Sequence, residues 1–370
     1  MSARTIDRYA RPVADTTWEV PQAFGTTFRW EYQDGREKLL NLYEKGKRLQ
    51  WNAAERIDWS QDVDPENPAG LPDEILPIFG SDVWNRMTDA ERAHLRHHFQ
   101  SWQFSQFLHG EQGALVCTAK IVQQVPGIDA KFYASTQVID EARHVEAYSR
   151  LLHDKLELVY PINPHLQALL ADTLSATDWD FTYLGMQVLI EGVALAAFGL
   201  IRDQSTSPLA AAVTAYVMQD EARHVAFGRL ALRDYYPQLT QKERDLREEF
   251  AVEGCYLLRD RFLAEEVWET LGLPVDQCMA YVDRSEMMKI YRSSLFTRIV
   301  PTMKEIGLWG PRIQKAYADM GVLGFADVDY DALSARDEQI GDEFDRRRAE
   351  VERVAASALR VEPAGEQPSA

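Results

Sequence analysis

The sequence DEARH occurs at residues 140–144 and again, unchanged, at residues 220–224. Five identical residues, four of them polar, are not expected to recur by chance within a chain of 370 residues. Glu111 precedes the glutamate of the first copy by 30 residues, and Glu191 precedes the glutamate of the second copy by the same distance. The chain therefore contains the order Glu, then Glu-x-x-His, twice.

The Glu-x-x-His spacing places two metal-binding side chains on one face of a helix, because positions i and i+3 are neighbours there. Two helices with Glu-x-x-His and two with a single Glu supply the ligands of ferritin-like di-metal carboxylate proteins. We therefore predict an all-α fold, a ferritin-like four-helix bundle with additional helices. The six predicted metal ligands are Glu111, Glu141, His144, Glu191, Glu221 and His224.

The two single glutamates lie in apolar surroundings. Glu191 interrupts the apolar run 185–198, and the residues that follow Glu111 are also apolar. An isolated ionised carboxylate loses a large solvation free energy on burial, and a metal ion removes that cost. Without a metal, either glutamate alone could instead be buried in an ion pair with an arginine, or lie on a solvent-exposed face of its helix. Equal spacing before two identical units favours the metal site.

The types of ligand indicate the metal and its chemistry. Carboxylates are hard oxygen ligands and imidazole suits iron, so the set favours iron or manganese. We predict two iron ions, with a mixed manganese–iron pair as the alternative. Such a cluster reacts with dioxygen and generates an oxidant for a C–H bond or an amine. Because the sequence has no redox-cofactor motif, we expect an external electron donor, a ferredoxin or a reductase.

The other charged residues of the repeat are predicted to support the ligands. A metal-bound histidine usually donates its second N–H to a carboxylate, which fixes its tautomer. Across an antiparallel bundle, we expect the aspartate of each copy to reach the histidine of the other, with an arginine closing the network. The alternative is a set of ordinary surface charges, which the repetition disfavours. These residues are Asp140, Arg143, Asp220 and Arg223.

Composition excludes several kinds of partner. The net charge of −18 argues against nucleic acid, whose phosphates require clustered lysine and arginine. The 3 cysteines have no CxxC spacing and indicate neither a disulfide framework nor a cysteine metal site. The sequence has no apolar signal-peptide core and no uncharged apolar stretch of transmembrane length. We therefore expect a cytoplasmic protein without a membrane partner, and we also expect a homodimer.

Capping and turn residues predict where the helices begin and end. Residues 88–91 form a capping-box pattern, and Ser207-Pro208 is typical of a helix start. We predict an N-terminal arm and short helix in 1–84, a ferritin-like di-iron helical domain in 85–310, and a C-terminal helix with a disordered tail in 311–370. The expected helices span about 35–54, 88–125, 129–156, 178–203, 208–235, 241–271, 275–305 and, as a charged, solvated helix, 326–356.

Over about residues 90–235 the pattern of ligands resembles the ferritin-like di-iron oxygenase superfamily. This superfamily includes the large hydroxylase subunits of bacterial multicomponent monooxygenases, acyl-carrier-protein desaturases, the small subunit of class I ribonucleotide reductase, and ligand-binding oxidases related to that subunit. Residues 43–52 and 57–60 are similar to a lead-in segment of some members. The resemblance implies oxygen chemistry but identifies no substrate.

Three positions near the ligands distinguish members of this superfamily. Tyr148 lies at the offset of the radical tyrosine of the reductase subunit, although a buried core tyrosine is the simpler interpretation. The 4-aminobenzoate N-oxygenases carry a further histidine where this chain has Val217, which argues against that subgroup. The multicomponent hydroxylases often place threonine where this chain has Leu195, which indicates a different branch.

The predicted function is that of a di-iron monooxygenase, which hydroxylates, N-oxygenates or desaturates a small apolar or aromatic molecule with O2. The first alternative is a radical-generating or ligand-binding oxidase related to the reductase subunit. A storage or peroxide-scavenging protein is disfavoured, because such chains are usually much shorter. Side chains one or two turns from the ligands either line a substrate cavity or pack the bundle. They are Phe107, Leu115, Gln187, Leu195 and Phe198.

Overall fold

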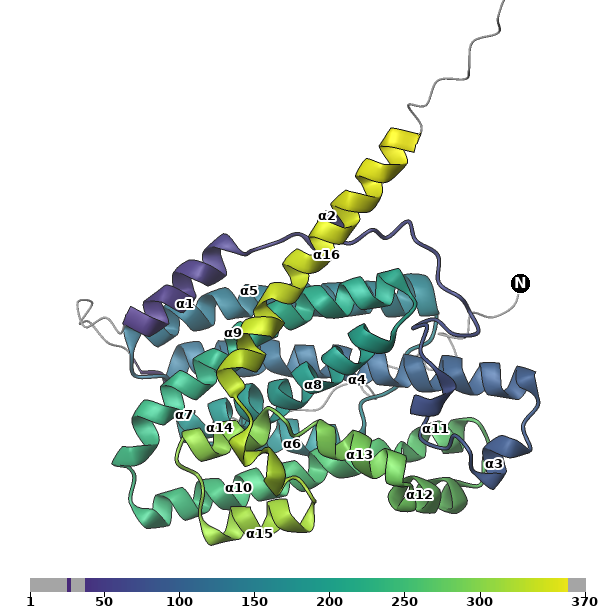
Figure 1. The fold of residues 1–370 in the computed structure, drawn as a ribbon. Helices are drawn as coiled ribbons and strands as arrows, with labels where there is room; N and C mark the ends of the chain where they lie inside the picture. The colour runs from purple at the N-terminus through teal and green to yellow at the C-terminus, as the bar shows by residue number, and fades with distance from the viewer. Residues whose placement is uncertain (1–24, 28–36, 359–370) are drawn as a thin grey trace, which may run out of the picture.

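Four long helical segments carry the predicted ligands. The computed structural model describes residues 25–27 and 37–358, and every regular element within them is a helix, as Figure 1 shows. The predicted extended arm and disordered tail lie largely outside the described residues. The four segments are α4 (Asp89–Gln124), α5 (Ile128–Arg150), α8 (Glu191–Gln204) and α9 (Pro208–Tyr235).

Local sequence accounts for the ends of two of these helices. At the start of α4, Thr88 and Glu91 form a reciprocal capping box. Its end at Gln124 follows from Pro126, because the residue before a proline is disfavoured in the helical conformation. At the start of α9, the Ser207 side chain accepts a hydrogen bond from the Ala210 N–H, and proline occupies the first turn.

The third ligand-bearing segment is continuous but irregular. It begins as α7 (Trp179–Tyr183), continues as the π-helical turn η5 (Leu184–Ile190), and becomes α8 at Glu191. A second π-helical turn, η4 (Leu151–Leu156), continues α5. Such turns occur often at functional sites, and here η5 ends next to a predicted ligand.

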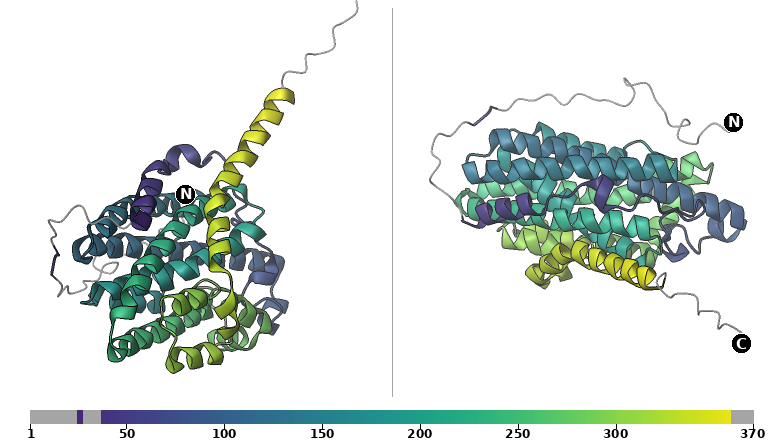
Figure 2. Two further views of the ribbon diagram at one scale, coloured as in Figure 1. Left: turned by 60° about the vertical axis from the view of Figure 1, so that its left-hand side comes forward. Right: turned by 90° about the horizontal axis from the view of Figure 1, so that it is seen from above.

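The bundle consists of two packed pairs of helices. Helix α4 packs along α5, α8 packs along α9, and contacts between α5 and α9 join the pairs. Figure 2 shows these helices running side by side along the length of the molecule. Side chains such as Phe104, Phe198 and Phe227 are almost completely buried between them. The predicted all-α bundle with additional helices is confirmed.

One helical segment of the bundle is unusually apolar. By length and composition, the segment Trp179–Gln204 is apolar enough to cross a membrane. In the folded chain, 89% of its most apolar window is buried. Packing in the bundle core therefore accounts for its apolar character.

Two outer helices cover the α5 and α9 side. Helix α1 (Glu37–Arg48) packs on both α5 and α9, and α16 (Tyr330–Ala358) packs on α9 before it extends away from the bundle (Figure 1). The prediction that 326–356 is a solvated helix is wrong for its first half, because Ile340 is buried there. The amide of Gln219 also donates hydrogen bonds to the carbonyl of Glu338 and to Asp342.

Three predicted helices are broken into shorter ones. A non-helical segment separates α1 from α2 (Ala53–Arg56), where 35–54 was expected to be one helix. Ala264 adopts a left-handed conformation (φ 52°) and ends the α10 region. Ser285 caps a new helix within 275–305. The remaining elements are η3 (Asp73–Ile75), α3 (Asp82–Asn85), α6 (Pro164–Ser175), η6 (Tyr236–Gln238), α10 (Gln241–Asp260), η7 (Arg261–Leu263), α11 (Glu265–Thr270), α12 (Val275–Arg284), α13 (Glu286–Ser294), α14 (Ile299–Glu305), α15 (Pro311–Asp319) and η8 (Leu323–Asp327).

Candidate metal centre

The structure brings the six predicted ligands together in the bundle interior. They form two overlapping groups, in each of which one ligand atom per residue lies within 4.8 Å of the others. Glu141 and Glu221 belong to both groups, so they are placed to bridge two ions. The first group is Glu111, Glu141, His144 and Glu221, and the second is Glu141, Glu191, Glu221 and His224.

Both imidazoles turn the same nitrogen toward the carboxylates. The Nδ1 atom of His144 lies 3.1 Å from Glu111 Oε2 and 3.1 Å from Glu221 Oε1. The Nδ1 atom of His224 lies 3.1 Å from Glu141 Oε1 and 3.3 Å from Glu221 Oε2. Each histidine therefore presents one nitrogen to the centre and leaves Nε2 for a partner outside it.

Two divalent cations fit this donor set. All six side chains are buried, and among the described residues Glu141 Oε2, Glu191 Oε2 and Glu221 Oε1 accept no hydrogen bond. Buried oxygens without partners are costly unless something positive binds them. Four carboxylates balance two divalent charges, and hard oxygen donors with imidazole suit iron or manganese. The residues would hold the two ions without further protein ligands.

The electrostatics indicate that ions and protons compete for the site. Burial and the neighbouring charge of Glu221 raise the pKa of Glu111 to about 8. Burial, Glu221 and Glu141 raise the pKa of Glu191 well above its usual value. Burial also opposes ionisation of Glu141, but His224 and His144 outweigh it and keep that pKa low. The protein alone therefore favours protonated carboxyls at two ligand positions.

The repeat forms a crossed network outside the ligands. His144 Nε2 lies 3.2 Å from Asp220 Oδ2, and His224 Nε2 lies 3.2 Å from Asp140 Oδ2. Each aspartate therefore contacts the histidine of the other copy, as the repeat suggested. Because the second nitrogen of each ring faces a carboxylate, it keeps its proton when Nδ1 binds a metal.

Two arginines complete this network. Arg143 donates to Asp140 and, at 2.7 Å, to Asp220, while Arg223 donates to Asp220. Two aspartates and two arginines carry no net charge together, so they leave the charge of the ligands for the ions. Arg223, Arg143 and the hydrogen bond from His144 hold the pKa of Asp220 well below its usual value, although burial alone would raise it.

Three supporting residues were not predicted. Gln50 donates to Asp140 at 2.7 Å, and the Trp51 indole N–H donates to Asp220 at 2.7 Å. Gln137 donates to Glu141 at 2.9 Å and to Glu191 at 3.0 Å. The only signal for Gln50 and Trp51 was the similarity of residues 43–52 to a lead-in segment. Gln137 lies one turn before Glu141, which its spacing alone could have indicated.

A small cavity of about 20 Å³ adjoins the ligands. Glu111, Glu191 and Glu221 contribute to its wall, together with apolar side chains. Of the predicted cavity residues, Phe107 and Phe198 line it, but the lining does not include Leu115, Gln187 or Leu195. Leu195 and Gln187 are completely buried in packing between helices, and Leu115 is partly exposed. The full lining is Gln106, Phe107, Gly110, Glu111, Ala114, Leu166, Met186, Ile190, Glu191, Ala194, Phe198, Glu221 and Arg261.

Tyr148 lies behind this cavity. Its ring packs against Phe104, Phe107 and Phe198, with centroids 5.8–6.2 Å apart. Burial raises the pKa of Tyr148 well above its usual value, and the charges of Glu111 and Glu221 raise it further. Tyr148 is therefore a neutral member of the aromatic core next to the predicted ligands.

The fold and the buried Glu/His centre define a helical di-metal carboxylate protein. The family model described as "P-aminobenzoate N-oxygenase AurF" matches residues 32–307, most of the chain. The chain belongs to this family, and it is a non-haem di-iron oxidoreductase that activates oxygen. The inference from Val217 against N-oxygenases was wrong: Val217 is buried on α9, and membership does not depend on a histidine there.

Solved structures with similar folds include R2-like ligand-binding oxidases. One has an aerobically reconstituted metal cofactor and matches at 17% identity with a TM-score of 0.48, covering 75% of this chain and 100% of its own. A variant with a Mn/Fe cofactor matches at 18% identity with a TM-score of 0.46, covering 76% of this chain and 96% of its own. No curated protein sequence matches the chain.

The sharing of Glu141 predicts how metal content responds to mutation. We expect Glu141→Ala to lose both ions, because both groups need this carboxylate. We expect His224→Ala to retain about one ion, because the other group stays complete. Metal analysis of the purified variants measures this difference, with Glu146→Ala on the exposed side of α5 as the control. Two ions in Glu141→Ala would contradict the assignment.

The raised pKa of Glu111 predicts a pH dependence of metal binding. A metal ion requires the ionised carboxylate, so below a pKa of about 8 it must displace a proton. We expect the affinity of the metal-free protein for Fe2+ or Mn2+ to rise between pH 6 and 8, about tenfold per pH unit for each displaced proton. Anaerobic titrations at several pH values measure it. An affinity that is constant over this range would show that no proton is displaced.

Proposed function

We propose that this protein transfers oxygen to the amino nitrogen of a small aromatic amine. The matched family is described as a P-aminobenzoate N-oxygenase. The observation that supports this chemistry most is the cavity, because Glu111, Glu191 and Glu221 share its wall with Phe107 and Phe198. An aromatic ring suits an apolar, aromatic lining, and its reacting atom would lie next to the metal ligands.

The residues of the chain have distinct roles in this reaction. Two iron ions held by the six ligands would supply electrons to dioxygen and the oxidising power for the substrate. The aspartates and arginines of the repeat fix the orientation of the histidine rings. The apolar wall around Phe107 and Phe198 excludes water and positions the ring of the substrate.

We propose iron at both metal positions, because the chain belongs to a di-iron family. A manganese–iron pair is the alternative, and a similar solved structure carries Mn/Fe. Carboxylate and imidazole ligands accept both metals, so the ligands do not separate the two. Metal analysis of protein produced with both metals supplied distinguishes them.

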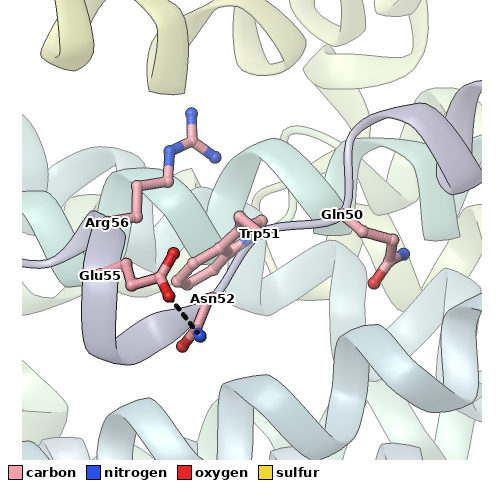
Figure 3. Close-up of a pocket in the computed structure, with 5 residues that line it drawn as sticks. All are labelled: Gln50, Trp51, Asn52, Glu55 and Arg56. Carbon is pink, nitrogen blue, oxygen red and sulfur yellow. Dashed lines mark hydrogen bonds between the residues drawn. The ribbon is translucent and has the colours of Figure 1, made fainter.

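We propose that electrons arrive from an external donor through the segment between α1 and α2. Figure 3 shows Gln50 and Trp51 in this segment, beside a pocket that Arg56 also lines. Trp51 is only partly buried, and its indole N–H contacts Asp220, which in turn contacts His144. This is a short, hydrogen-bonded connection from the surface to a predicted ligand. A ferredoxin or a reductase is the expected donor.

We also propose a cytoplasmic homodimer. Phe132 and Ile139 lie seven residues apart on α5 and are exposed, with Ile139 at 57%. Exposed apolar side chains that share a helix face are typical of association surfaces. Light scattering in solution measures the mass of the particle, and a monomer at all concentrations would exclude the dimer.

The proposed reaction predicts a defined product. We expect iron-loaded protein, given a reductant and oxygen-18 gas, to convert 4-aminobenzoate into a product with labelled oxygen on nitrogen, which mass spectrometry detects. The metal-poor Glu141→Ala protein is the control. Hydroxylation of the ring, with an unchanged amino group, would contradict N-oxygenation. A stable tyrosyl radical that disappears in Tyr148→Phe, without any product, would favour the alternative of a radical-generating oxidase.

The electron route predicts a selective effect of Trp51→Phe. This change removes the indole N–H that contacts Asp220 but keeps an aromatic ring. We expect the same metal content, at least tenfold slower reduction of the centre by a protein donor, and normal turnover with hydrogen peroxide, which supplies oxygen and electrons together. Stopped-flow absorbance measures reduction. Trp59→Phe, whose indole N–H donates to Ala53 O instead, is the control. Equal rates of reduction by the protein donor in Trp51→Phe and Trp59→Phe would exclude this route.

A further inference from the structure

Arg261 is buried where the cavity meets the outer helices. It begins η7, directly after α10, and only 6% of its surface is exposed. It lines the same cavity as the three glutamates of the metal centre. The cavity therefore has carboxylates that hold metals in one part of its wall and a guanidinium in another.

The guanidinium of Arg261 has no partner in the described part of the chain. No hydrogen bond or ion pair forms from its side chain within residues 25–27 and 37–358, and its guanidinium carbon lies 4.9 Å from the centre of the Phe262 ring. Each of the other buried arginines in these ranges has a carboxylate within 4 Å. These are Arg143, Arg223, Arg247 and Arg292.

The charges around the site leave Arg261 uncompensated. Two divalent ions would balance the charge of the four glutamates, and Arg143 and Arg223 balance the charge of the aspartates of the repeat. Burial lowers the pKa of Arg261 to about 10, with Tyr291 opposing the shift, so the group is still charged at neutral pH. A buried charge without a partner is costly, and an anion in the cavity would remove that cost.

We propose that Arg261 is a specificity-determining residue that binds a carboxylate on the arylamine substrate. This inference rests on the proposed N-oxygenation. A planar guanidinium matches a carboxylate with two parallel hydrogen bonds. Bound to Arg261, the carboxylate of the substrate lies at the wall of the cavity that also contains the metal ligands. The amino end is then free to face the metals.

The rest of the lining agrees with an aromatic acid. Phe107, Phe198 and Leu166 supply apolar surface for a ring. Gln106 is not a second anchor, because its amide already donates to Pro161 O and accepts from the Asn163 N–H. A cavity of about 20 Å³ holds no more than a water, so the lining side chains must move to admit the ring.

Binding measured without oxygen tests this role directly. Calorimetry on iron-loaded protein gives the Kd of 4-aminobenzoate and of 4-methylaniline, which lacks the carboxylate. We expect Arg261→Gln to weaken 4-aminobenzoate roughly 30-fold or more, the usual effect of removing one partner of a buried charge pair. We expect 4-methylaniline to bind equally to both proteins. Arg259→Gln is the control, because Arg259 pairs with Asp260 outside the cavity.

Each outcome decides between the two proposals. An unchanged Kd of 4-aminobenzoate in a folded Arg261→Gln protein overturns the role of Arg261, and N-oxygenation of arylamines would still stand. Binding of 4-aminobenzoate that depends on Arg261, without any oxygenated product, supports the anchor and overturns the proposed reaction. If Arg261→Gln does not fold, binding to the wild-type protein tests the proposal instead. Equal affinities for 4-aminobenzoate and 4-methylaniline would overturn the role of Arg261. Competition between benzoate and 4-aminobenzoate for the site would support it.

Discussion

The burial of four carboxylates in the middle of a helical bundle is the constraint on which this structure depends. Glu111, Glu141, Glu191 and Glu221 are nearly inaccessible to solvent. Such a cluster is unfavourable for the protein alone, because burial and repulsion from neighbouring carboxylates favour the protonated forms of Glu111 and Glu191. Two divalent ions reverse this preference. The bundle is therefore a scaffold whose interior is completed by the metals that it is built to hold.

The surrounding layer solves a second electrostatic problem. Histidine ligands need a fixed tautomer, and Asp140 and Asp220 provide it across the bundle. Those aspartates would add negative charge to a centre that already has too much, but Arg143 and Arg223 neutralise them. Each copy of the pentapeptide thus contains two metal ligands, the glutamate and the histidine. It also contains an aspartate and an arginine, which together carry no net charge and support the histidine of the other copy. This explains why all its charged members recur together.

The cavity beside the metal centre is the place where we propose that the substrate binds. Its wall combines elements that are far apart in the sequence, from α4 through α6, η5, α8 and α9 to η7. The π-helical turn η5 contributes Met186 and Ile190 immediately before the ligand Glu191. The proposed chemistry and selectivity therefore come from different parts of the chain. The repeat, with Glu111 and Glu191, forms the metal centre, whereas Arg261 and the phenylalanines line the cavity in which we propose that the substrate binds.

The sequence by itself determined the bundle and the positions of the clustered side chains. The signals used were local: the i, i+3 spacing of the ligands, the exact repeat and the residues that cap helices. The bounds of α4 and α9 were therefore predicted closely. Tertiary structure alone decided the break before α2, which brings Trp51 to Asp220, and the end of α10, which places Arg261 in the cavity. These features depend on which segments meet in space. A local pattern of helix periodicity does not show which distant segments come into contact.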